Sequence, residues 1–161
     1  MSLPLRVALK QCKRHASALL DALSHIPRPV TAQQLEKASP ELARFLDQFT
    51  LRVTKLQDTL GVRALGVHKL RQFAVEVLQE PIEDVAFIDV SCLLEKRGYL
   101  MSDDWSEQRR RRNALMHEYP EDKKRQAEAL SKAQVATDQL IEWLAAVIRS
   151  IKTSTPRMQS A

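Results

Sequence analysis

The sequence predicts an all-α fold, and three observations indicate it. Glycine, with 3 residues, and aromatic side chains, at 5%, are scarce among the 161 residues. Leu, Ala, Gln, Glu, Lys and Arg are abundant, and these residue types favour helices over sheets. Apolar residues also recur at three- and four-residue steps along most of the chain. Because the connections between the expected helices are short, we expect an up-and-down antiparallel bundle.

The first predicted helix covers about residues 5–23. Leucine, alanine and cysteine side chains repeat there at helical spacing. Pro27 and Pro29 end the pattern, since proline lacks the donor that a helix needs. Thr31 and Gln34 then have the spacing of a capping box, which predicts a short helical piece.

A long helix is expected next, with an apolar face over residues 42–60. Ser39 is a good N-cap residue, and Pro40 suits the first helical position because its missing N–H costs nothing there. We expect this helix to end at Gly61, which can adopt the left-handed conformation common just after a helix.

The second half of the chain predicts four more helices, over about residues 67–79, 85–96, 102–118 and 121–151. Pro81 and Gly98 end the first two of these, and Pro120 disfavours helix at the residue before it. Since 161 residues suit one domain, we expect a single helical domain over residues 1–152 and a disordered tail over residues 153–161.

Composition also constrains location and partners. The start of the chain lacks an uninterrupted apolar segment of the signal-peptide kind, and no later stretch approaches the roughly 20 apolar residues that span a membrane. We therefore expect a soluble, cytoplasmic protein without a membrane partner. Cys12 and Cys92 form no CxxC motif, so two buried, reduced thiols are expected. The net charge of +5 is compatible with a polyanionic partner, and equally with a basic surface of no special role.

The chemically informative stretch runs from Arg109 to Pro120 and crowds a guanidinium, an imidazole and a phenol into two helical turns. Arg112 can grip a phosphate with two donors, and His117 can move protons near neutral pH. This combination predicts a phosphate site. The stretch lacks the clustered carboxylates that hold magnesium, and a single histidine is not a zinc site, so we expect neither a metal nor another cofactor.

Helical geometry limits how these groups meet. At 100° per residue, Asn113 lies beneath His117, whereas Arg112 and His117 are about 140° apart and cannot share a face of an ideal helix. Two explanations remain open. Either Pro120 frays the last turn and redirects His117, or a symmetric dimer completes each site with the arginine of the other subunit.

The spacing from Arg112 through His117 to Tyr119 resembles the RX4HXY motif of HEPN toxins. The segments 45–58 and 90–100 are similar to the long second helix of that family and to the segment before its motif helix. The resemblance covers about residues 42–143. It implies the HEPN-like helical fold, a homodimer, and a metal-independent endoribonuclease. It further implies the toxin of a type II or type VII toxin–antitoxin pair, neutralised by a minimal nucleotidyltransferase (MNT).

The resemblance also implies a role for each motif residue. Arg112 would stabilise charge on the scissile phosphate, and His117 would act as general base or acid for attack by the ribose 2′-hydroxyl. Asn113 would orient the imidazole, and Tyr119 would receive AMP from the antitoxin. Asp58 is a weaker candidate for a supporting polar contact.

The functional interpretation has rivals. Arg109, Arg110 and Arg111 either contact RNA or form a solvated helix face, and the latter is the more frequent use of such a run. The whole chain could serve as a non-catalytic, substrate-binding partner of a nucleotidyltransferase, or as a basic helical module that binds nucleic acid without cutting it. The complete set of arginine, histidine and tyrosine favours the enzyme, because an adaptor has no evident need for an imidazole beside a phosphate-binding arginine.

Overall fold

The computed structural model describes residues 3–62, 73–82, 86–99, 102–117 and 121–154. Every regular element in these ranges is helical, which confirms the all-α class. The elements are α1 (Leu3–Ser24), α2 (Ala32–Glu36), α3 (Pro40–Gln57), the π-helical η1 (Asp58–Val62), α5 (Phe87–Lys96), α6 (Ser102–Met116) and α7 (Lys123–Ser154). No helix in the described part of the chain is long and apolar enough to cross a membrane.

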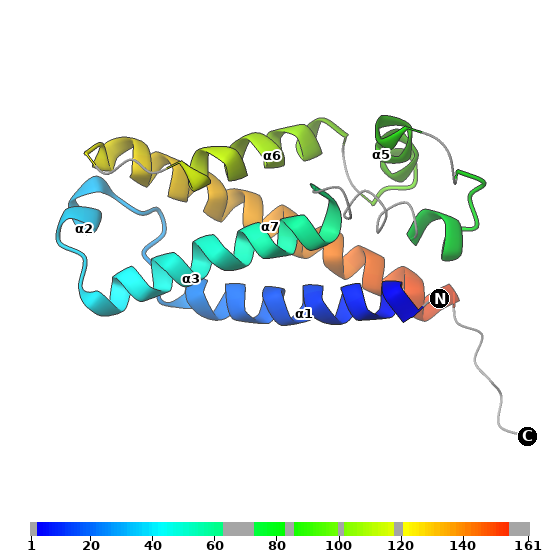
Figure 1. Cartoon of the computed structure of the whole chain (residues 1–161), viewed down its shortest axis with the longest axis horizontal. Helices are drawn as coiled ribbons and strands as arrows, with labels where there is room; N and C mark the ends of the chain where they lie inside the picture. The colour runs from blue at the N-terminus through cyan, green and yellow to red at the C-terminus, as the bar shows by residue number, and fades with distance from the viewer. Residues whose placement is uncertain (1–2, 63–72, 83–85, 100–101, 118–120, 155–161) are drawn as a thin grey trace, which may run out of the picture.

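The three longest helices lie alongside one another, and α3 runs back along α1 (Figure 1). Two contacts fix the register of this pair. The side-chain amide of Gln48 donates to the carbonyl oxygen of Ala18 at 3.2 Å, and Nη1 of Arg52 lies 3.3 Å from Nδ1 of His15. The core between the helices is apolar, with Leu19, Phe49, Leu56, Leu94 and Leu140 fully buried.

The helix starts follow local rules and confirm the expectations for them. Thr31 and Gln34 form a complete capping box at α2. The Ser39 hydroxyl accepts a hydrogen bond from the backbone N–H of Leu42 at 3.1 Å, with Pro40 at the first position of α3. These caps satisfy N–H groups that have no partner inside their helices.

The end of α3 was predicted wrongly. Gly61 does not stop the helix, because the chain changes from α to π geometry at Asp58 and stays helical through Val62. A π turn holds one residue more than an α turn, so side chains after it are rotated relative to the preceding helix, and such turns are frequent at functional sites. The residues that follow, 63–72, lie outside the described ranges, so the first part of the predicted helix 67–79, up to residue 72, does too.

Two later helix ends use the left-handed backbone conformation. Residues 73–76 are helical, and Gln79 then has a φ of 58°, two residues before Pro81. Gly98, with a φ of 74°, follows α5 as predicted, and its N–H donates to the carbonyl oxygen of Glu95 at 2.8 Å. At the other end of the chain α7 continues to Ser154, two residues beyond Lys152, and residues 155–161 lie outside the described ranges.

Buried amides attach α7 to its neighbours. Gln108 of α6 is 2% exposed and donates to the carbonyl oxygen of Ala136 at 2.9 Å. Gln134 is also buried and donates to the carbonyl oxygen of Pro27 at 2.9 Å. Because burying an amide is costly unless it is hydrogen-bonded, these contacts fix α6 and the loop after α1 against α7.

The two thiols differ in their surroundings. Cys12 is 2% exposed, and burial raises its pKa to about 12. Cys92 is only partly buried, so the expectation of two buried thiols was wrong for this residue. Neither forms a disulfide.

Candidate functional site

Two contacts one helical turn apart join α6 to α3 and its π-helical extension. The Thr54 hydroxyl, which donates to the carbonyl oxygen of Thr50 at 2.8 Å, lies 3.4 Å from the sulfur of Met116, and Nη2 of Arg112 lies 2.9 Å from Oδ1 of Asp58. Thr54 and Asp58 are four residues apart, as are Arg112 and Met116. Side chains four residues apart lie on the same side of a helix. The two segments therefore run in opposite directions in a fixed register at this point.

The ion pair between Arg112 and Asp58 is partly buried, with side-chain exposures of 15% and 24%. Its charges attract at 2.9 Å, but Oδ1 of Asp58 accepts no hydrogen bond, so the guanidinium does not point squarely at it. Nε of Arg112 is likewise buried and makes no hydrogen bond. The carboxylate thus holds the arginine in place by charge while leaving part of its donor capacity unused.

A neighbouring amide is also unsatisfied. Gln57 precedes Asp58 and is 1% exposed, yet neither polar atom of its side chain has a hydrogen-bond partner. Buried polar groups in folded proteins are nearly always hydrogen-bonded, and the exceptions concentrate at sites with a catalytic role, stored strain or an unseen partner. Three of the five such side chains in the described ranges, Gln57, Asp58 and Arg112, lie at the start of the π turn and on the helix facing it, and the other two, Arg52 and Gln134, lie elsewhere.

His117 follows the last residue of α6 and caps the end of that helix with its backbone. Its N–H lies 3.2 Å from the carbonyl oxygen of Asn113 and 3.3 Å from that of Ala114, an arrangement typical of a fraying helix end. The imidazole is exposed. The helix ends at Met116, a little before the predicted residue 118, so His117 has left the regular helical path.

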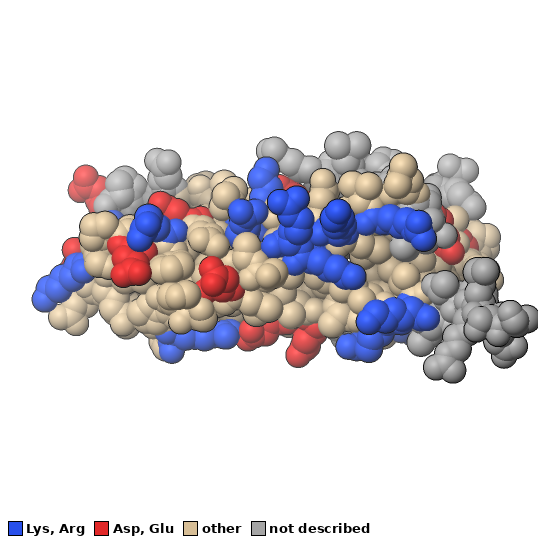
Figure 2. Space-filling model, turned by 90° about the horizontal axis from the view of Figure 1, so that it is seen from below, with Lys and Arg blue, Asp and Glu red and all other residues tan. Residues whose placement is uncertain are grey.

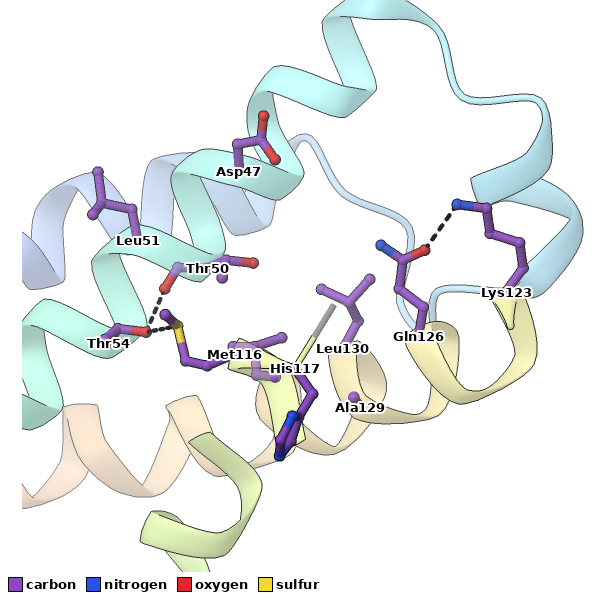
Figure 3. Close-up of a pocket in the computed structure, with 11 residues that line it drawn as sticks. Asp47, Thr50, Leu51, Thr54, Met116, His117, Lys123, Gln126, Ala129 and Leu130 are labelled. Atoms are coloured by element: carbon purple, nitrogen blue, oxygen red, sulfur yellow. Dashed lines mark hydrogen bonds between the residues drawn. The ribbon is translucent and has the colours of Figure 1, made fainter. Parts of the chain in front are cut away.

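An open pocket of about 550 Å³ lies between α3, the end of α6 and the start of α7 (Figure 3). His117 is at its edge, with its ring directed away from Thr50 and Asp47. Lys123 and Gln126 line the pocket from α7, and Nζ of Lys123 donates to Oε1 of Gln126 at 3.2 Å. The full lining is Asp47, Thr50, Leu51, Thr54, Leu115, Met116, His117, Lys123, Gln126, Ala129 and Leu130.

The predicted site residues therefore fall into separate positions. Arg112 and Asp58 meet each other, and His117 lines a pocket to which Arg112 does not contribute. Asn113 offers its carbonyl oxygen to His117, while its exposed side chain makes no hydrogen bond to the imidazole within the described part of the chain. Tyr119 lies outside the described residues.

The arginine run before the motif is partly neutralised by a carboxylate of the same helix. Nε of Arg111 donates to Oε1 of Glu107 at 2.9 Å, and Arg110 pairs with the other carboxylate oxygen. The hydrogen bond from Arg111 is the main reason that the pKa of Glu107 is lowered. Arg109 is exposed. Arg110 and Arg111, two of the three candidate RNA contacts, are thus already paired with Glu107.

Sequence reasoning missed the polar wall that α3 contributes. Asp47, Thr50 and Thr54 line the pocket and occur at steps of three and four residues, which places them along one side of α3. This polar stripe beside the apolar face was visible in the sequence and predicts a helix side that faces a cleft or a partner rather than the core.

Neither a metal-ligand cluster nor a similar protein helps to identify the site. Among the residues in the described ranges, no three His, Cys, Asp or Glu side chains lie together as a metal site requires. Comparisons of the chain with protein-family models, with curated proteins and with solved structures gave no match.

Proposed function

We propose that this chain is the toxin of a toxin–antitoxin pair, an endoribonuclease with the HEPN-type up-and-down bundle. The observation that carries the proposal is the placement of two chemical groups, one on α6 and one directly after it. Asp58, at the start of η1, holds the guanidinium of Arg112 on α6, and His117, the residue after the end of α6, lies at the edge of an open pocket.

These groups fit cleavage of RNA by its own 2′-hydroxyl. His117 takes the hydroxyl proton as the 2′-oxygen bonds to the adjacent phosphorus, and the bond from phosphorus to the 5′-oxygen breaks. The 5′-oxygen takes a proton from water as it leaves, and His117 returns its own proton to water, so the products are a cyclic phosphate and a 5′-hydroxyl. Arg112 stabilises the extra negative charge on the phosphate in the transition state. The reaction needs no metal, because the nucleophile and its base are supplied by the substrate and the protein.

Because Arg112 does not line the pocket that holds His117, we infer that the working site is shared between two copies of the chain. In a symmetric dimer each subunit presents its arginine to the histidine of the other. The cytoplasmic partner in this proposal is an MNT antitoxin that transfers AMP to Tyr119.

The proposal is tested with purified chain and a single-stranded RNA substrate. Replacing Arg112 or His117 with alanine should lower the cleavage rate by at least about a hundredfold, the usual contribution of such groups. Arg44→Ala is the matched control, since it removes an exposed arginine that is not among the candidate RNA contacts. Circular dichroism verifies that each variant stays helical. Cleavage that persists in both folded variants contradicts the enzyme.

One observation favours a second function, the non-catalytic partner of a nucleotidyltransferase. In a single chain Arg112 is engaged by Asp58, as a purely structural ion pair would be, and the pocket contains only one of the two motif groups. This function predicts that expression of the chain does not arrest growth, that the chain cuts no RNA, and that it forms a complex with the nucleotidyltransferase.

A further inference from the structure

The face of the protein opposite α6 carries a concentration of positive charge on α1. Arg6, Lys10, Lys13 and Arg14 are all exposed. At 100° per residue these four side chains fall within a sector of about 100°, and at 1.5 Å per residue they extend along about 12 Å of helix. The one acidic residue of α1 is Asp21, near its other end.

α3 extends this surface. The contact between His15 and Arg52 places the second half of α3 beside the basic part of α1, and Lys55 is exposed one turn further along. We refer to these six residues, Arg6, Lys10, Lys13, Arg14, Arg52 and Lys55, as the cationic face. Figure 2, which looks at the α1 side, shows basic side chains gathered over the N-terminal half of that helix, with few acidic ones among them.

Within the described part of the chain, none of the six residues of the cationic face forms an ion pair. By contrast, Arg110 and Arg111 pair with Glu107, and Arg112 pairs with Asp58. Like charges that gather without counter-charges oppose folding, so this arrangement suits an external anion.

A histidine inside the cluster responds to this positive potential. The pKa of His15 is lowered, first by burial and then by the charges of Arg52, Lys55 and Arg14. A cationic imidazole is therefore disfavoured among these neighbours, whereas a bound anion would relieve the same repulsion.

The N-terminal part of the face also has a hollow. Arg6, Lys10 and Lys13 of α1 and Lys152 of α7 surround an open groove of about 240 Å³, and apolar side chains complete its lining. The apolar residues are Leu9, Ile148 and Ile151. Such a groove offers cations for phosphates beside a surface against which a sugar or base can pack.

We propose that the cationic face binds the sugar–phosphate backbone of RNA, as a docking surface separate from the site of cleavage. The choice of RNA over another polyanion rests on the proposed function. α1 and α6 lie on opposite sides of the molecule in Figure 1, so RNA held on α1 does not occupy the pocket at His117. A single RNA strand must then extend from α1 around the protein to the pocket at His117, or one subunit of a dimer must hold the RNA that the other subunit cuts.

Binding is measured by fluorescence anisotropy with a labelled 2′-O-methyl oligoribonucleotide, which lacks the attacking hydroxyl and stays intact. The double variant Lys10→Gln/Arg14→Gln should bind on the order of tenfold more weakly. The slope of log K against log salt should also fall by about 1.4, since each phosphate contact on a single strand contributes about 0.7. Single replacement of Lys10 should give about half of that change in slope.

Two matched doubles separate this surface from general charge. Lys37→Gln/Lys132→Gln removes two exposed lysines elsewhere, and Arg110→Gln/Arg111→Gln removes two arginines of the paired run. Both should keep nearly the parental affinity. The inference is overturned if either double weakens binding as much as the α1 variant does. It is also overturned if the parent ignores the oligonucleotide and binds phosphatidylserine vesicles instead.

Failure of this inference is distinguishable from failure of the proposed function. Unmodified RNA that is cut in a manner dependent on His117, with binding unaffected by Lys10 and Arg14, removes only the docking surface. Oligonucleotide binding that depends on Lys10 and Arg14, without cleavage of unmodified RNA, removes only the endoribonuclease.

Discussion

Nη2 of Arg112 and Oδ1 of Asp58 lie 2.9 Å apart, and this ion pair connects the π turn after α3 to the helix that carries the motif. Both side chains are less than a quarter exposed, so removing one charge leaves the other poorly solvated. The pair is therefore expected to matter to both stability and the placement of Arg112.

We predict that Asp58→Asn lowers the free energy of unfolding by about 2 kcal/mol, because it leaves a partly buried guanidinium without its counter-charge. Urea denaturation measures the change. Asp47→Asn is the control, since Asp47 lies on α3, the helix that η1 continues, but is exposed, and it should change stability by less than about 0.5 kcal/mol. Equal effects of the two substitutions contradict a structural role for the pair.

Local rules account for much of what the sequence predicted. The caps at Thr31 and Ser39 involve residues three positions apart, so their chemistry is visible in the sequence. The pairing of Glu107 with Arg110 and Arg111 has the same short range and was predictable from spacing alone. The alternatives given for Arg109, Arg110 and Arg111, RNA contact or a solvated helix face, did not include this pairing with Glu107.

Features that depend on tertiary packing were not predictable in the same way. The change to π geometry at Asp58 is not marked by Gly61 or by any proline, and it accompanies a contact with Arg112 from far along the chain. The separation of Arg112 from the pocket of His117 follows from that contact. A 140° offset on an ideal helix anticipates such a separation, but it does not identify the carboxylate that receives the arginine.

The buried thiol provides a test of the core. Because the pKa of Cys12 is about 12, its reactive thiolate is only about one ten-thousandth of the population near pH 8. We predict rapid alkylation of Cys92 alone in the folded protein, and of both thiols in denaturant. Mass spectrometry after iodoacetamide treatment measures this, and Cys92→Ser should abolish the rapid phase. Alkylation of Cys12 at the same rate as Cys92 disagrees with the packing of α1.

Stability should depend on pH through His15. Its pKa is lowered in the folded state, so below its ordinary value of 6.5 the unfolded chain binds the proton more readily. The free energy of unfolding therefore has its full value above pH 6.5 and decreases as the pH falls from there through the lowered pKa of folded His15. His15→Gln should therefore flatten the decline in stability on acidification. If His15→Gln is already less stable than the parent near pH 8, where the imidazole is neutral in both states, that difference reflects packing and not protonation.

The shared site predicts complementation between inactive chains. Arg112→Ala and His117→Ala are each inactive under the proposed function, but a mixed dimer contains one site with both groups intact. Co-refolding equal amounts should restore up to about a quarter of parental RNA cleavage, if half of the dimers are mixed and each has one of two sites. Light scattering provides the control, since a chain that is monomeric at micromolar concentration cannot share a site.

The last prediction concerns control of the enzyme through Tyr119. Only one residue separates Tyr119 from His117 in the sequence, so an adenylyl group on this phenol would lie near the histidine and its pocket. The new phosphodiester is anionic and would compete with the scissile phosphate for the guanidinium of Arg112, while the adenosine adds bulk. Co-expression with the cognate nucleotidyltransferase should therefore add AMP to the chain and abolish cleavage. Intact-mass analysis and peptide mapping measure the addition.

Tyr119→Phe separates modification from simple complex formation. It removes the acceptor oxygen but leaves Arg112 and His117 in place, so the variant should stay toxic and should not be rescued by the catalytic activity of the antitoxin. A catalytically inactive nucleotidyltransferase is the matched control, because it can still bind the chain. If that inactive partner neutralises parent and variant equally, inhibition occurs by binding, and the phenol of Tyr119 has no part in it.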